Sequence, residues 1–121
     1  MNVQKITSLY CIIIGISMML LWIALLLSNQ VPELVIAPVK ILYHLIAEFL
    51  TAILLIISGI GLFLKRTWSF HLSLISLGML LYTVIVSAGY YANLGDMIMV
   101  GMFSLFQILT IYILVLSLKN Q

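Results

Sequence analysis

Residues 41–64 read ILYHLIAEFLTAILLIISGIGLFL, and this stretch decides the fold class. It is apolar from end to end except for a few polar side chains, and Glu48 carries its only full charge. A helix needs about 20 apolar residues to cross the hydrocarbon core of a bilayer. Three more runs of the same character lie at residues 6–28, 68–91 and 97–118. The chain is therefore predicted to be an all-α integral membrane four-helix bundle, a single domain over residues 1–121.

The composition indicates a lipid environment and excludes several classes of function. Hydrophobic residues make up 65% of the chain and charged residues only 7%, whereas a soluble domain carries roughly 25% charged residues. The lipid bilayer is thus the expected partner of most of the surface. A formal net charge of +2 is too small for the basic patch that nucleic-acid binding requires. The continuously apolar runs also lack the alternating polarity of membrane β-strands.

Short connections set the expected topology. Residues 65–67 and 92–96 are short enough to make neighbouring helices antiparallel, and residues 29–40 contain both prolines. An up-down-up-down bundle is the natural closure. It places Lys5, Lys65, Arg66 and Lys119 on one side and leaves Lys40 alone on the other. Because basic residues concentrate in cytoplasmic loops, both termini are predicted to be cytoplasmic, in a bacterial-type inner (plasma) membrane.

Glu48 is the residue most strongly indicated as functional. It lies seven residues into its predicted span, which is roughly 10 Å below the outer hydrocarbon boundary. A carboxylate facing lipid there costs at least ~2.5–3.5 kcal/mol, so Glu48 is expected to face the bundle interior. Acids in such positions serve proton relays and substrate sites, or they form hydrogen bonds that hold helices together. Both interpretations stay open for Glu48.

His44 lies one helical turn before Glu48, so the two side chains share a face. This face is the predicted buried stripe of the span, and it comprises Lys40, His44, Glu48, Thr51, Leu55, Ser58 and Gly59. The pair could share a proton, since histidine titrates near neutrality, or supply two ligands to a metal ion. A third ligand would have to come from Asp96, Glu33 or a second chain. A histidine that is hydrogen-bonded near the water boundary is the alternative.

Tyr82 and Gln107 complete the candidate ligand- or proton-binding site. Both lie at depths close to that of Glu48, in the third and fourth spans. The geometry allows a Glu48–Tyr82–Gln107 hydrogen-bond cluster if the helices turn these faces inward. Taken alone, each side chain more often forms a hydrogen bond that joins two helices. His71 lies roughly 25 Å from His44 along the membrane normal. That separation excludes a haem held by both histidines within one chain.

Three kinds of function remain open. The favoured one is proton-coupled transport, or the binding of a small ligand or ion, at Glu48 and His44. The second is a non-catalytic anchor, assembly factor or regulatory subunit of a larger membrane complex. The third is a redox protein that uses quinone, haem or a metal. Hydrolase motifs are absent from the sequence, so an enzyme is not favoured and no cofactor is expected. Four spans form a thin bundle, so a homo-oligomer or a membrane-protein partner is expected.

Overall fold

The computed structural model describes residues 3–28 and 33–119, and every regular element within them is an α-helix. The four long helices are α1 (Val3–Leu27), α3 (Pro38–Phe63), α4 (Ser69–Asn93) and α5 (Met97–Lys119), and a single turn of helix, α2 (Glu33–Ile36), precedes α3. Each long helix has the length and hydropathy needed to cross a membrane. The prediction of an all-α protein with four long apolar helices is therefore confirmed.

Helices α1 and α3 both begin three residues before the predicted spans, and the informative case is the start of α3. The prediction places it at residue 41, whereas the helix begins at Pro38, with the proline in its first turn. A proline fits there because the N–H that it lacks would have no partner within the helix, and because its fixed φ is already helical. Part of the predicted connection is thus helical. The other proline, Pro32, lies outside the described residues.

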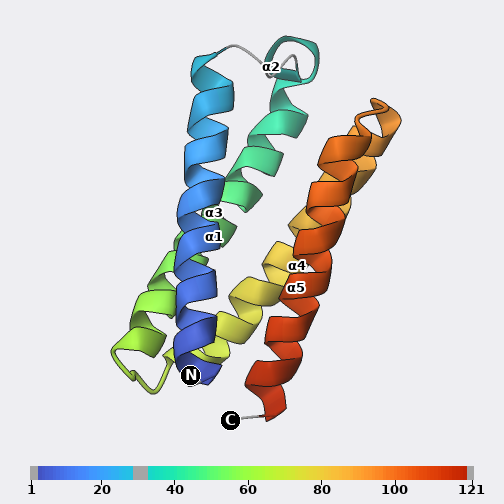
Figure 1. Ribbon diagram of the computed structural model, residues 1–121. Helices are drawn as coiled ribbons and strands as arrows, with labels where there is room; N and C mark the ends of the chain where they lie inside the picture. The colour runs from blue at the N-terminus through green and yellow to red at the C-terminus, as the bar shows by residue number, and fades with distance from the viewer. Residues whose placement is uncertain (1–2, 29–32, 120–121) are drawn as a thin grey trace.

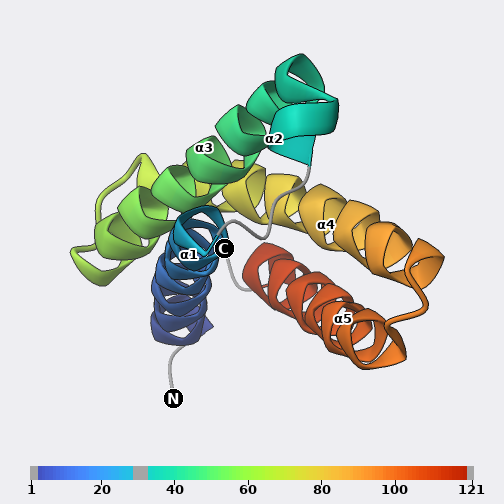
Figure 2. The same ribbon diagram turned by 90° about the horizontal axis from the view of Figure 1, so that it is seen from above.

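The long helices form two pairs. α1 packs along α3, α5 packs along α4, and α3 joins the pairs through its contact with α4. The first turn of α1 and the last turn of α5 lie at the same end of the molecule, next to the green turn between α3 and α4 (Figure 1). Seen from above, α3 and α4 diverge as they leave that turn (Figure 2). The two pairs are therefore closest at the end where α1 begins.

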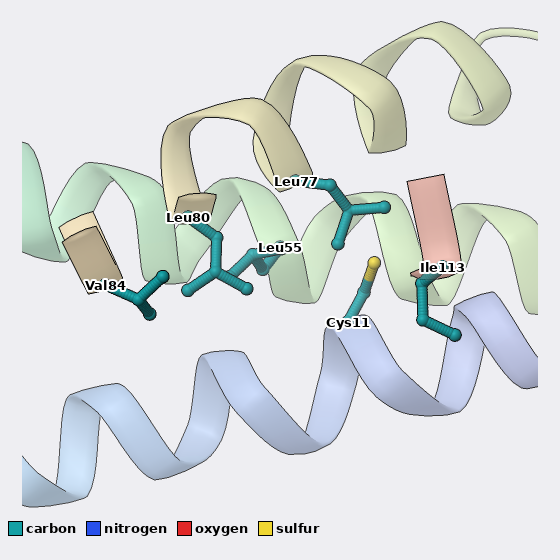
Figure 3. Packing of buried hydrophobic residues seen from close by; sticks show 6 residues of the cluster. All are labelled: Cys11, Leu55, Leu77, Leu80, Val84 and Ile113. Carbon is teal, nitrogen blue, oxygen red and sulfur yellow. The ribbon is translucent and has the colours of Figure 1, made fainter. Parts of the chain in front are cut away.

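The buried core lies toward this end. Its apolar side chains come from all four long helices (Figure 3): Cys11, Leu55, Leu77, Leu80, Val84 and Ile113. In α1 every buried residue precedes Ile16, and in α5 every buried residue follows Leu109. The opposite halves of these two helices expose large apolar side chains such as Leu20 and Ile98. Hydrocarbon tails are as apolar as leucine, so such a surface suits lipid.

Hydroxyl groups join α1 to α5 at the packed end. The Thr7 and Ser117 hydroxyl oxygens lie 3.0 Å apart, and those of Tyr10 and Thr110 lie 2.7 Å apart. Bonds of this kind hold membrane helices together because they satisfy polar groups inside hydrocarbon. They set the register of α1 against α5, where apolar packing is slight.

Two glycines let α1 and α3 approach closely. A Cβ atom at Gly15 would lie 2.8 Å from the backbone oxygen of Ala52, and one at Gly59 would lie 2.9 Å from that of Ser8. The Ser8 hydroxyl donates a hydrogen bond to the Gly59 carbonyl oxygen at 2.6 Å. Small residues are the usual means of bringing two membrane helices into backbone contact. The contact fixes α1 against α3, and the candidate site lies between these two helices.

The turns after α3 and α4 have the same backbone geometry but different residues at the critical position. Lys65 (φ 60°) and Gly95 (φ 75°) both adopt the left-handed conformation. In each turn the N–H of the next residue, Arg66 or Asp96, bonds to the carbonyl oxygen five residues earlier, at 2.9 Å and 3.0 Å, which is a common helix ending. Glycine adopts this conformation freely. A lysine there costs about 1–2 kcal/mol.

Candidate functional site

Glu48 is buried on the face of α3 that the sequence predicts. Its exposed fraction is 5%. The later members of the predicted stripe are also buried: Thr51, Leu55, Ser58 and Gly59. Lys40, in the first turn of α3, is exposed. Small and hydroxyl-bearing side chains make this face compatible with close helix packing. The prediction that Glu48 turns away from lipid is therefore confirmed.

Trp22 of α1 is the hydrogen-bond donor to this carboxylate. Its indole Nε1–H donates to Glu48 Oε2 at 3.3 Å. The indole ring also meets the His44 ring edge-on, with the ring centroids 5.5 Å apart and an interplanar angle of 68°. The two helices thus place an indole, an imidazole and a carboxylate in mutual contact. This contact depends on the close approach of α1 to α3.

The second carboxylate oxygen of Glu48 lacks a hydrogen bond. Oε1 is fully buried and has no partner among the described residues. The nearest ionisable group is His44, whose Nε2 lies 3.6 Å from Oε1, slightly beyond hydrogen-bond length. An unsatisfied buried acceptor costs about 1–3 kcal/mol. A proton placed between these two atoms would remove that cost.

His44 and Glu48 differ sharply in their access to the surroundings. The His44 side chain is 36% exposed, whereas that of Glu48 is 5% exposed. Within the described residues, no lysine or arginine forms an ion pair with Glu48. Neutralisation of the carboxylate must therefore come from His44, from a bound proton or from a small cation. The two side chains therefore form a polar connection, one helical turn long, from the exposed surface of α3 to the buried contact between α3 and α1.

Tyr82 and Gln107 do not join this site. Tyr82 is 71% exposed on α4, so the inward orientation on which the predicted cluster depends is not present. Gln107 is half-buried on α5, a helix that packs chiefly on α4. Glu48 instead faces Trp22 of α1. The structure therefore does not form the Glu48–Tyr82–Gln107 cluster, because α3 turns its carboxylate toward the first helix and not toward the last two.

Asp96 is also separate from the His44–Glu48 pair. It is exposed in the turn before α5, and its Oδ1 accepts a hydrogen bond from the Met99 N–H at 3.3 Å. It therefore caps the start of the helix, as aspartate commonly does. The described residues contain no group of three histidine, cysteine, aspartate or glutamate side chains that could hold a metal ion. The side chain of Glu33 lies outside the part that the structure describes.

Trp22 is the site residue that sequence reasoning missed, although a signal for it exists. Ser8, Cys11 and Gly15 are buried and recur at steps of three and four along α1. This spacing marks one helical face. Trp22 lies seven residues after Gly15, or about two turns, on the same face. The small residues therefore identify the side of α1 that meets α3, and extending that side leads to Trp22.

Four apolar helices of membrane-crossing length, with a carboxylate enclosed between two of them, define a small multi-pass membrane protein. The chain belongs to the family described as Domain of unknown function (DUF8058), whose model matches residues 1–121. No curated protein and no solved structure matches the chain.

Proposed function

We propose that this protein binds and releases a proton at the Glu48–His44 pair as part of proton-coupled transport of a small cation across a membrane. The observation that carries the proposal is the buried Glu48 Oε1, which has no hydrogen-bond partner among the described residues. It faces His44 Nε2 at 3.6 Å. Acidic residues within membrane helices that lie beside an ionisable partner commonly mark proton relays and ion pathways.

The geometry gives each member of the pair a separate task. A proton on His44 makes an ion pair with the Glu48 carboxylate, and a proton on Oε1 can be donated to the imidazole nitrogen. His44, which is partly exposed, exchanges the proton with the surroundings, and Glu48, which is buried, stores it. Trp22 donates to the other carboxylate oxygen, Oε2, and can do so in either protonation state. A small cation would compete with the proton for the same carboxylate.

The proposed orientation is an up-down-up-down bundle with both termini in the cytoplasm of a bacterial-type inner membrane. Lys5, Lys65, Arg66 and Lys119 then lie on the cytoplasmic side, as the bias of basic residues toward cytoplasmic loops requires. In this orientation the Glu48–His44 pair lies in the outer half of the membrane. The site would therefore exchange protons with the outer side, through His44.

A flux measurement tests the proposal. The purified protein is reconstituted into liposomes with a trapped pH-sensitive dye, and the internal pH is followed after external acidification, with and without sodium or tetraphenylphosphonium as cationic probes. We expect a flux that Glu48→Gln abolishes. Asp96→Asn is the matched control, since it neutralises an exposed carboxylate in a turn and should leave the flux intact. Equal flux in the wild type and in Glu48→Gln would refute proton coupling at this residue.

A second candidate function is a subunit that assembles with another membrane protein or with a second copy of itself. It is favoured by Gly78 and Gly89 of α4, where an added Cβ would have no neighbour within 4 Å from any other described part of the chain. They are eleven residues apart, or about three turns, so they share a face, and the exposed Tyr82 lies on the same stripe. Small residues on an outer face permit close approach of another helix.

Cross-linking in the native membrane tests this second candidate. Gly78→Leu should reduce any cross-linked product, because the added side chain separates the helices. Ile75→Leu, at a position with 57% exposure on the same helix, should leave the product unchanged. A chain that stays monomeric in its native membrane would exclude self-assembly. The absence of a co-purifying partner would exclude assembly with another membrane protein.

A further inference from the structure

A cavity of about 410 Å³ lies at the packed end of the molecule, where α1, α4 and α5 meet the turn after α3. Its polar lining includes Gln4, Thr7, Lys65, Arg66, Ser69 and Ser117. This end holds the first turn of α1, the green turn and the last turn of α5 (Figure 1). It lies about 20 Å from Glu48 along α3 by helical rise. The cavity is therefore separate from the proton site, and what it binds does not depend on the proposed function.

The charged residues that line the cavity are all cationic. Lys65 and Arg66 supply two cations, and no aspartate or glutamate lines the cavity. Both cations are exposed in the turn, and neither forms an ion pair with a described carboxylate. A cavity with two unneutralised cations and hydroxyl groups selects an anion.

Buried hydroxyl groups supply the cavity with a hydrogen-bond donor in addition to the two cations. Thr7 is 2% exposed and Ser117 is 6% exposed, and their hydroxyl oxygens lie 3.0 Å apart. One hydroxyl donates to the other, so the proton of the second remains for a ligand. The Ser69 hydroxyl instead donates to the Arg66 carbonyl oxygen at 2.5 Å. Its role is to hold the backbone of the cationic turn in place.

The backbone of Lys65 adopts a left-handed conformation that glycine would adopt more easily, so backbone folding alone does not explain a lysine at this position. The turn after α4 uses Gly95 at the equivalent left-handed position, whereas the turn after α3 uses Lys65. Left-handed residues other than glycine cluster at ligand-binding sites, where the surrounding structure maintains the strain. Here the strained position places a cation on the cavity wall.

We propose that the cavity beside Lys65 and Arg66 binds the phosphate group of an anionic phospholipid or of a small soluble phosphate compound. A guanidinium donates two parallel hydrogen bonds to phosphate, and an ammonium binds it as a point charge. Basic pockets between membrane helices at the membrane surface bind phospholipid headgroups. The cavity volume exceeds that of a single phosphate ion, and it leaves room for the group that carries the phosphate.

Native mass spectrometry of the detergent-solubilised full chain tests the proposal. The probes are phosphatidylglycerol, phosphatidylcholine and inorganic phosphate, each titrated separately. We expect saturable binding of phosphatidylglycerol, weaker binding of phosphatidylcholine, and a loss of about fivefold in affinity for each cation removed. Saturable binding of inorganic phosphate at equal strength would assign the site to soluble phosphate compounds instead of lipid.

Three variants distinguish specific binding in the cavity from non-specific attraction of anions to surface cations. Lys65→Gly removes one cation and suits the backbone conformation, so it should fold at least as well as the wild type. Arg66→Gln removes the other cation. Lys5→Gln is the matched control, since Lys5 is exposed in the first turn of α1 but does not line the cavity. Equal losses in Lys65→Gly and Lys5→Gln, or no saturable binding of any probe, would overturn the proposal.

Discussion

The indole N–H of Trp22 donates a hydrogen bond to the Glu48 carboxylate across the interface between α1 and α3, at 3.3 Å. This bond connects the only buried carboxylate among the described residues to a helix distant from it in sequence. The stability of the α1–α3 pair and the chemistry of the site are therefore linked through two side chains.

Removing the indole donor should destabilise the protein. Trp22→Phe keeps an aromatic ring but leaves both Glu48 oxygens without a described hydrogen-bond partner, at a cost of about 1–3 kcal/mol. Thermal unfolding in detergent should show a lower Tm. Trp68→Phe is the control, because Trp68 is 50% exposed and lies beside the turn after α3. The prediction fails if both variants lower the Tm equally.

The imidazole of His44 should control proton exchange with the buried carboxylate. His44→Gln keeps a polar side chain but removes the imidazole, whose Nε2 lies 3.6 Å from the Glu48 carboxylate and whose ring is partly exposed. The proton flux into liposomes should fall, and its dependence on external pH should become weaker. A variant that retains the wild-type pH profile would show that the proton reaches Glu48 by another route.

The close approach at Gly15 should be intolerant of even one methyl group. A Cβ there would lie 2.8 Å from the Ala52 backbone oxygen, so Gly15→Ala must push α1 away from α3, at about 1–3 kcal/mol. Gly78→Ala adds the same methyl group into open space and should be neutral or stabilising by up to about 1 kcal/mol. Unfolding of the two variants in the same detergent compares them directly, and a similar Tm for both would contradict the proposed packing.

The two left-handed turns should respond in opposite directions to exchange of their residues. Lys65→Gly relieves an unfavourable φ and should stabilise the protein by about 1 kcal/mol, less any loss of ligand binding. Gly95→Ala introduces the same strain and should destabilise it by about 1–2 kcal/mol. The free energy of unfolding, measured in lipid-free detergent, separates backbone strain from the effect of a bound lipid. Destabilisation by Lys65→Gly under these conditions would be the contrary result.

Sequence reasoning works best for α3 because that helix carries a strong pattern. Glu48, Thr51 and Ser58 recur at steps of three and seven among apolar residues, which places them on one helical face. A polar side chain that faces lipid is unfavourable, most strongly for the ionisable Glu48. Their common face is therefore predictable, and all three are buried. The four long helices are predictable for a simpler reason, since only length and hydropathy decide them.

The orientation of α4 and α5 is harder to predict, because lipid and protein interior are equally apolar. A hydrophobic pattern then does not distinguish the face that meets another helix from the face that meets lipid. Tyr82 and Gln107 match the depth of Glu48, but depth does not determine which way a side chain points. Trp22 required a further step, since its role depends on the register that Gly15 and Gly59 impose on α1 and α3.

The hydroxyl bonds that join Thr7 to Ser117 and Tyr10 to Thr110 also bear on biogenesis. Because α1 is synthesised before α5, the α1 hydroxyl groups cannot reach these partners until α5 has been inserted. A nascent chain that stops before α5 would expose them to lipid. The contact between α1 and α5 can therefore form only after both helices lie in the bilayer, and the packed end is among the last parts of this bundle to assemble.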